Sequence, residues 1–236
     1  MEHNRSTMTQ TRETTFDAGL QKYMQRVYNV MAAGLVLTGF VAYVTFQTPQ
    51  LFQAVHGSIL GIIIMLSPLG IIFFGLTPNK VARMSTAAVS GLYFLLTGLI
   101  GLSMSYIFAV YSSESIARVF FVTAGMFAAT SIYGYTTKKD LAAMGSFLFM
   151  GLIGLIIAMV VNIFLQSTMM QFVISGAGVL IFTGLTAWDT QRIKETYHAS
   201  LGSVTLTKMA TMGALSLYLD FINLFQFLLQ FMGNRE

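Results

Sequence analysis

The sequence contains no cysteine, and charged residues make up only 9% of its 236 positions. Without cysteine, the chain forms no disulfide bond and offers no thiolate ligand to a metal. A soluble domain carries about 25% charged residues. The low charge, together with 55% hydrophobic residues and a mean hydropathy of +0.71, therefore indicates a polytopic membrane protein. The net charge of +4 does not indicate nucleic-acid binding, because the basic residues are scattered along the chain.

Motifs of soluble enzymes are also missing. The sequence has no phosphate-binding loop, no H-E-x-x-H and no G-x-S-x-G. His3, His56 and His198 lie far apart in the sequence, which argues against a histidine metal site. We therefore expect neither enzymatic activity nor a bound cofactor.

The first 22 residues are polar and lack the apolar core of a secretory signal. We expect residues 1–22 to form a mobile cytoplasmic tail, and residues 23–236 to form a transmembrane domain whose first apolar segment acts as an uncleaved anchor.

Seven stretches approach the roughly 20 apolar residues that a spanning helix needs. The predicted fold is therefore all-α with seven transmembrane helices, at Tyr23–Phe46, Ser58–Leu76, Met84–Val110, Ile116–Tyr135, Gly145–Leu165, Gln171–Asp189 and Met209–Met232.

Basic residues divide unequally between the two sides of this topology. Eleven fall on the side of the N-terminus: Arg5, Arg12, Lys22, Arg26, Lys80, Arg83, Lys138, Lys139, Arg192, Lys194 and Lys208. Two, Arg118 and Arg235, fall on the other side. Because cytoplasmic loops are enriched in Lys and Arg, the split predicts a cytoplasmic N-terminus and an external C-terminus.

Small residues recur on two of the predicted spans. Gly91, Gly98 and Ser105 are spaced by seven residues, and a second set shares one face of the fifth span: Gly151, Gly154 and Ala158. Such spacing lets helix backbones approach closely in lipid. Membrane helices are rich in glycine in any case, so we assign these stripes no function.

Two of the nine acidic residues lie in or at the edge of a span, Asp189 and Asp220. An ionised Asp near the bilayer centre costs about 2.5–3.5 kcal/mol on insertion scales. No Lys or Arg lies within either apolar core to offset this cost. Two close carboxylates do not both ionise easily, so we predict that Asp189 and Asp220 face each other and share a proton.

The helical spacing supports a polar inner face on the seventh span. Gly213, Ser216, Asp220 and Asn223 follow one another at steps of 3, 4 and 3 residues, and Thr186 lies one turn from Asp189 on the sixth span. Counted from the nearest basic residues, the two carboxylates differ in depth by roughly 10 Å. Tilting the seventh helix, or starting it outside the bilayer, removes this difference.

Purely structural interpretations of Asp189, Asp220 and Trp188 remain open. Asp189 is three positions from Arg192, close enough for an interfacial ion pair on one helix face. Asp220 could be a purely structural hydrogen-bonding group, and the neighbouring Trp188 an interfacial anchor.

Three segments resemble signatures of the Bax-inhibitor, or TMBIM, membrane family, most closely its bacterial YbhL-like branch. They are "LSLYLDFINLFQFLLQFMG" (215–233), "GLTAWDTQRIK" (184–194) and "YGYTTKKDL" (133–141). The resemblance extends over essentially everything after the tail. It implies two three-helix layers around a central C-terminal helix, and a pH-sensitive calcium leak controlled by a hydrogen-bonded aspartate pair, which falls on Asp189 and Asp220.

Some members of the family carry an arginine near the cytoplasmic end of the second helix that latches onto the pair. This sequence has "PNKVARM" there, so the possible latch residues are Lys80 and Arg83. Lysine is a poorer bidentate partner for a carboxylate than arginine.

The combined prediction is a bacterial inner-membrane protein that passes a cation, Ca²⁺ in the first place, down its gradient. Asp189 and Asp220 would gate the path and give oxygen ligands to the passing ion, and Ser216, Asn223 and Thr186 would line it. Its partners would be the bilayer, Ca²⁺ and H⁺, with no nucleic acid.

Two other classes remain open. A regulatory partner of a membrane protease or other membrane complex would need no transport of its own. An intramembrane aspartyl protease also needs two carboxylates, but enzymes of the presenilin type carry G-x-G-D, whereas Asp220 follows "LYL" and Asp189 follows "TAW".

Overall fold

The computed structural model describes residues 2–234, and it describes side chains from Ala18 onward except at position 60. Its elements are α1 (Glu2–Gln47), α2 (Pro49–His56), α3 (Ile59–Gly70), a π-helical turn η1 (Ile71–Gly75), α4 (Pro78–Arg83), α5 (Thr86–Met104), α6 (Ile107–Val110), α7 (Ser113–Thr136), α8 (Ala142–Leu165), α9 (Thr168–Glu195) and α10 (Ser203–Met232). The predicted all-α class is confirmed.

Among the described residues, six helices are long and apolar enough to cross a membrane, and a bent pair raises the number to seven. The pair consists of α2 and the α3–η1 segment, which meet at 69°. The predicted second span, 58–76, corresponds to α3 with η1, so the seven predicted spans are all found when this bent pair counts as one.

Pro68 explains the irregular backbone of the α3–η1 segment. A proline inside a helix cannot donate to the carbonyl four residues earlier, here that of Ile64. The hydroxyl of Ser67 donates to this oxygen instead, at 2.8 Å. The regular helix ends at Gly70 and continues as the wider turn η1.

Serine side chains begin three of the spanning helices. Ser85, Ser112 and Ser167 each accept a hydrogen bond from the backbone N–H three residues on, at the starts of α5, α7 and α9. This satisfies one of the backbone donors that a helix start leaves unpaired, and it sets where these helices begin.

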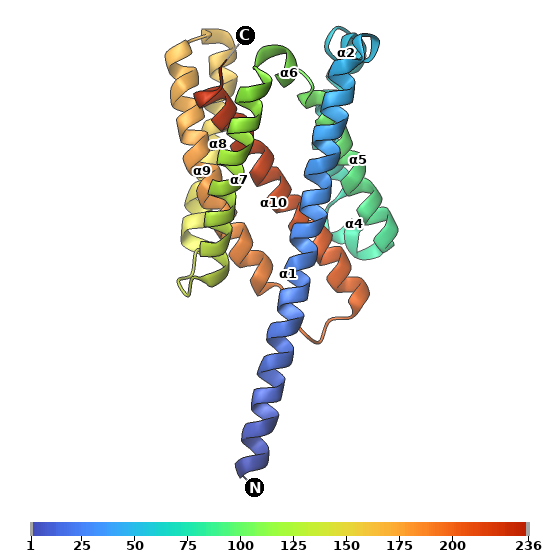
Figure 1. The fold of residues 1–236 in the computed structure, drawn as a ribbon, viewed down its shortest axis with the longest axis vertical. Coiled ribbons are helices and arrows are strands. Elements are labelled where there is room, and N and C mark those ends of the chain that lie inside the picture. The colour runs from blue at the N-terminus through green and yellow to red at the C-terminus, as the bar shows by residue number, and fades with distance from the viewer. Residues whose placement is uncertain (1, 235–236) are drawn as a thin grey trace.

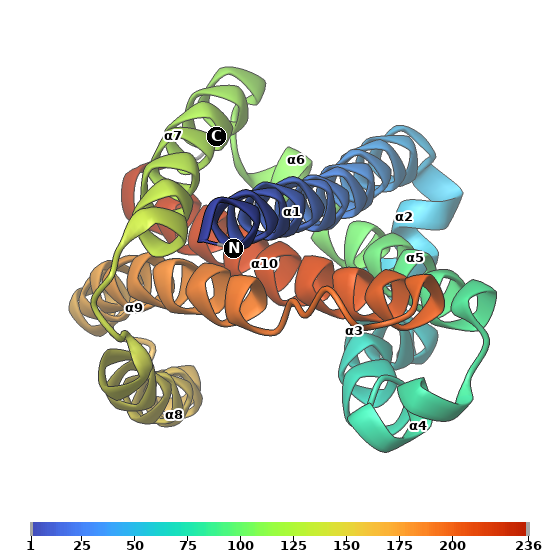
Figure 2. The same cartoon turned by 90° about the horizontal axis from the view of Figure 1, so that it is seen from below.

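The spanning helices form two groups of three around α10 (Figures 1 and 2). α1 and α3 both pack on α5, α7 and α8 both pack on α9, and α10 contacts α1, α5, α7 and α9. Of the 18-residue apolar window of α10, 72% is buried, against 11–39% in the other five spanning helices. The C-terminal helix is therefore the central one, as predicted.

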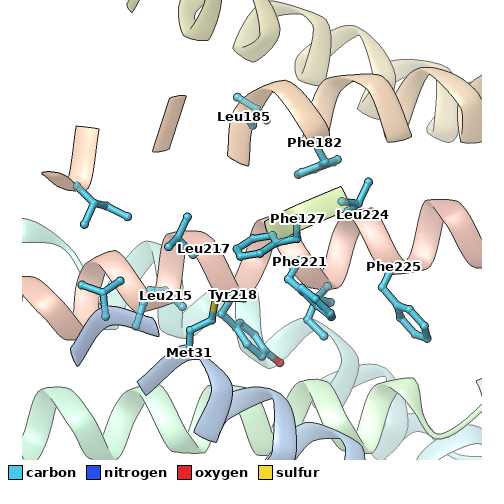
Figure 3. Close-up of a cluster of buried hydrophobic side chains, with 14 of the residues drawn as sticks. Met31, Phe127, Phe182, Leu185, Leu215, Leu217, Tyr218, Phe221, Leu224 and Phe225 are labelled. Atoms are coloured by element: carbon cyan, nitrogen blue, oxygen red, sulfur yellow. The ribbon is translucent and has the colours of Figure 1, made fainter. Parts of the chain in front are cut away.

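The core follows α10, as Figure 3 shows for its middle turns. Leu217, Tyr218 and Leu224 on α10 are fully buried, and Met31 of α1 and Phe182 of α9 belong to the same apolar cluster. In a membrane, side chains outside such a core would contact apolar lipid and not water, so burial alone gives little stabilisation. Close packing and hydrogen bonds between helices hold the core together instead.

The polar segment 1–22 does not form a separate element. α1 runs without a break from Glu2 to Gln47, and its membrane-spanning part begins at Ala18. The mobility of this segment stays a prediction.

Candidate functional site

Asp189 and Asp220 meet between α9 and α10. Their side chains are hydrogen-bonded to each other. α10 begins at Ser203, six residues before the predicted start, and crosses the molecule at a tilt (Figure 1). The early start and the tilt account for the difference in depth that the two sequence positions would have in upright helices.

Asp220 lies in the packed centre of the protein. Its side chain is 5% exposed, and its Oδ2 has no hydrogen-bond partner among the described residues. A buried polar atom without a partner costs roughly 1–3 kcal/mol, and more if it is charged. A group this costly at the middle of the central helix points to a role beyond packing.

Asp189 lines a cavity of about 550 Å³. The cavity lies on the face of the molecule where α1 begins, between α1, α4, α9 and α10, and Ser216 lies in its wall. Asp189 is therefore reached from this cavity, whereas Asp220 lies behind it in the core. The remaining lining residues are Tyr23, Pro78, Val81, Ala82, Arg192, Ile193, Thr196, Thr205, Lys208, Met209, Met212 and Gly213.

Two basic residues lie at this cavity. The Nζ of Lys208 donates to the carbonyl of Ala82 at 3.0 Å, which ties the start of α10 to α4. Arg192 interacts electrostatically with Asp189, and its guanidinium lies 5.4 Å from the centre of the Trp188 ring. Asp189 is therefore bonded to Asp220 in the core, while Arg192 acts on it only through its charge, from the wall of the same cavity.

The predicted lining residues divide into two kinds. Ser216 lies in the cavity wall with Asp189. The hydroxyl of Thr186 donates to Phe182 O at 2.7 Å, and the amide of Asn223 donates to Leu219 O at 2.7 Å. Both of these bonds stay within the residue's own helix, and the structure does not place Thr186 or Asn223 in the cavity wall.

The possible latch residues, Lys80 and Arg83, lie on α4 away from the carboxyl pair. The Nζ of Lys80 donates to the carbonyl of Phe74 at 2.6 Å. Arg83 is exposed at the end of α4. The cavity is lined instead by their neighbours Val81 and Ala82. In this arrangement Arg192, which sequence reasoning treated only as a rival partner, is the cation beside Asp189.

A hydrogen-bonded link between α1, α5 and α10 was not predicted. Thr38 donates to Thr97 O at 2.8 Å, so its oxygen accepts from the hydroxyl of Tyr218 at 2.7 Å. The ring of Tyr93 packs edge-on against Tyr218, with ring centres 6.0 Å apart. These contacts hold the helix that bears Asp220, but their partners lie up to 180 residues apart, and no local pattern marks them.

The chemistry open to the pair follows from its geometry. Two carboxyl groups bond to each other only when one of them donates a proton. Without that proton, the same oxygens repel one another and attract a hard cation such as Ca²⁺. The described part of the chain has no cluster of three or more His, Cys, Asp or Glu side chains.

The fold and this site define a helical, polytopic membrane protein with an acidic pair beside its central helix. A family model described as "Inhibitor of apoptosis-promoting Bax1" matches residues 20–236. The chain therefore belongs to the Bax-inhibitor family.

Individual relatives match along almost the whole chain. A protein of Rickettsia prowazekii is 43% identical over 236 residues, covering 100% of this chain and 99% of that one. The inner membrane protein YbhL of Escherichia coli is 42% identical over 224 residues, covering 93% and 94%. A membrane protein of Streptococcus pyogenes is 34% identical over 226 residues, covering 94% and 97%.

Proposed function

We propose that this protein is a cation leak channel of the bacterial inner membrane that passes Ca²⁺ and is gated by proton exchange at Asp189 and Asp220. The observation that supports this most strongly is the position of the pair. One carboxyl group lines a cavity open to one face of the membrane protein, and the other is bonded to it from the buried central helix.

The closed state is the one in which the two carboxyl groups share a proton. The bond between them joins α9 to α10, and the pair then carries one negative charge, which the two groups share, instead of two. Loss of the proton places two negative charges side by side, which weakens the contact between the helices and creates an oxygen-rich site. Whether flux rises or falls with pH depends on the balance between this repulsion and the tighter hold on the cation.

Ca²⁺ fits the site as cargo rather than as a resident ion. Carboxylate and hydroxyl oxygens suit a hard cation, and Ser216 adds a hydroxyl in the cavity wall beside Asp189. Conduction requires binding strong enough to admit an ion and weak enough to release it. Two carboxylates with few further ligands meet that condition better than a closed cage does.

The apolar spans support a membrane location, and the relative named inner membrane protein YbhL supports the inner membrane. The excess of basic residues on the face where α1 begins assigns that face to the cytoplasm. The cavity with Asp189 would then open to the cytoplasm, and the face that bears α2 and α6 would be external.

The test is Ca²⁺ flux into liposomes that contain only this protein, measured from about pH 5 to 8. Asp220→Asn keeps the shape and a hydrogen bond but does not titrate, so we expect it to flatten the pH profile. Asp189→Asn should do the same, and the double variant should add little, because the two residues act as one unit. Glu195→Gln, which removes an exposed charge from the end of α9, is the matched control.

Two results contradict the proposal in different ways. A wild-type pH profile in either single Asp→Asn variant means that proton sharing does not gate the path. Absence of flux in the wild-type protein means that it is not a channel, and favours the non-transporting regulatory role instead.

A further inference from the structure

A row of side chains continues along the α9–α10 contact beyond the carboxyl pair. Phe182 lies seven residues before Asp189 on α9, and Phe227 lies seven residues after Asp220 on α10. Seven residues are about two helical turns, or about 10 Å. Because the two helices run in opposite directions, these steps lead to the same level, and the two rings stack with centres 5.7 Å apart and planes 23° apart.

This ring layer is closed and buried. Phe182 is 5% exposed and Phe227 is 6% exposed, and Figure 3 shows Phe182 projecting from α9 toward α10 beside Leu224. Gly178 makes the close fit possible, since a Cβ there would lie 2.5 Å from Cγ of the Phe227 ring. Any larger residue at 178 would have to displace this ring.

A group of polar side chains lies on the far side of the ring layer. Gln171 is in the first turn of α9 and donates to the side-chain oxygen of Gln230, in the last turn of α10, at 2.6 Å. Ser175 approaches the same oxygen at 3.5 Å, and Asn162 of α8 donates to Gln171 Oε1 at 3.2 Å. We call these four residues the outer amide cluster. Asn162 and Ser175 are buried although the cluster lies near the helix ends.

The α9–α10 contact therefore has polar groups at both ends and an aromatic layer between them. From Ser216 in the cavity to Gln230 is 14 residues along α10, or about 21 Å of the roughly 30 Å of hydrocarbon. The polar ends offer oxygens to an ion, and the stacked rings offer none. Apolar constrictions of this kind stop ions because the constriction excludes the water that an ion needs around it.

We propose that Phe182 and Phe227 form a hydrophobic constriction, and that the cation path runs along the α9–α10 contact from the cavity through the carboxyl pair and this constriction to the outer amide cluster. The proposal rests on the proposed channel function and adds the outer half of the path. The carboxyl pair responds to protons, and the ring layer limits the basal cation flux.

The first experiment measures Ca²⁺ flux in proteoliposomes for Phe182→Ala and Phe227→Ala. Each removes one ring of the layer, so we expect basal flux to rise several-fold. Phe172→Ala and Phe231→Ala are matched controls, because these residues form another stacked pair on the same two helices, with centres 4.8 Å apart and exposures of 55% and 42% at the lipid surface. The controls should leave flux unchanged.

A second experiment detects the constriction without measuring transport. The chain has no cysteine, so Ser216→Cys introduces a single thiol in the cavity. A membrane-impermeant thiol reagent should label it from one face of membrane vesicles only. Adding Phe227→Ala should make it reachable from both faces. Phe227→Leu, which keeps an apolar side chain of moderate size, replaces Phe227→Ala if the alanine variant does not fold.

The outcomes separate the two proposals. If wild-type flux is absent but labelling becomes two-sided on ring removal, the channel function is wrong and the ring layer is still a water barrier. If the Asp→Asn variants alter flux while ring removal changes neither flux nor labelling, the path does not pass Phe182 and Phe227. An equal rise in the Phe172→Ala and Phe231→Ala controls would mean general loosening and would also overturn the constriction.

Discussion

A close backbone approach between α7 and α9 depends on one glycine. Gly134 lies against the backbone of Ala187, so that a Cβ at 134 would overlap the Ala187 carbonyl oxygen. Ala187 is two residues from Asp189, and the hydroxyl groups of Ser131 and Thr190 bond nearby at 3.2 Å. This contact holds α9 against α7 close to Asp189.

Gly134→Ala should therefore destabilise the protein by about 1–3 kcal/mol, the range for overpacking a closely packed contact. Gly125→Ala on the same helix should cost nothing, because no atom lies within 4 Å of a Cβ there. Melting temperatures in detergent give the comparison. Equal melting temperatures for the two variants would mean that α7 and α9 can separate without loss.

The small-residue stripes identified by spacing mark helix contacts only in part, since a Cβ at Gly151 would lie 3.4 Å from the Ile181 side chain of α9. No atom lies within 4 Å of a Cβ built at Gly91, Gly98 or Gly154. The glycines that do meet a neighbour include Gly134, and Gly145, over which the ring of Trp188 packs. Trp188 is thus a packing residue between α8 and α9. Spacing shows that residues share a face, but only the packed helices show which face meets a neighbour.

At the scale of elements, the short helix α4 closes one side of the cavity without bringing a charge to the carboxyl pair. Val81 and Ala82 line the cavity, and Lys208 bonds to the Ala82 carbonyl. Lys80 turns to the Phe74 carbonyl at the end of η1. The charge that acts on Asp189 comes from Arg192, in the last turn of α9.

Neutralising the basic residues of α9 and α4 one at a time should show which helix supplies the charge that affects flux. Arg192→Gln removes a positive charge at the cavity, which repels an entering cation, so we expect Ca²⁺ flux to rise several-fold and the difference to shrink at high salt. Lys80→Ala and Arg83→Ala should keep wild-type flux. A changed basal leak in either of these two variants would instead support a latch on α4.

At the scale of the whole molecule, the two ends of the described chain lie on opposite faces (Figure 1). The start of α1, the helix α4, and the α7–α8 and α9–α10 connections share the face of the cavity, while α2 and α6 lie at the other. This arrangement matches the alternation of an odd number of spans. It also places the eleven-residue basic group of the sequence count on the cavity side.

A reporter fused after Glu236 should therefore be periplasmic, and one inserted near His198, in the α9–α10 connection, should be cytoplasmic. Paired reporters that are active on opposite sides of the membrane, such as alkaline phosphatase and a fluorescent protein, check this directly. Finding both positions on the same side would contradict the seven-span arrangement and the assignment of the cavity to the cytoplasm.

The helical class, the approximate spans and the two carboxylates were all predictable from the amino-acid sequence. The physical reason is that lipid forces every backbone polar group into helical hydrogen bonds and makes each buried charge costly. The length of an apolar segment and a single Asp within it can therefore be recognised from the local sequence alone. The early start of α10 was open only as one of two alternatives, because its first turns are mixed in polarity and lie beyond the apolar run.

The packing of the helices determined how residues distant in the sequence combine. It placed Asp189 against Asp220 and in the same cavity wall as Arg192, put Ser216 but not Asn223 or Thr186 in that wall, and bonded Lys80 to the Phe74 carbonyl instead of to the pair. It also aligned Phe182 with Phe227 across two antiparallel helices. Such pairings depend on the tilt and rotation of whole helices. Packing between helices sets both, and the periodicity of a single helix does not reveal them.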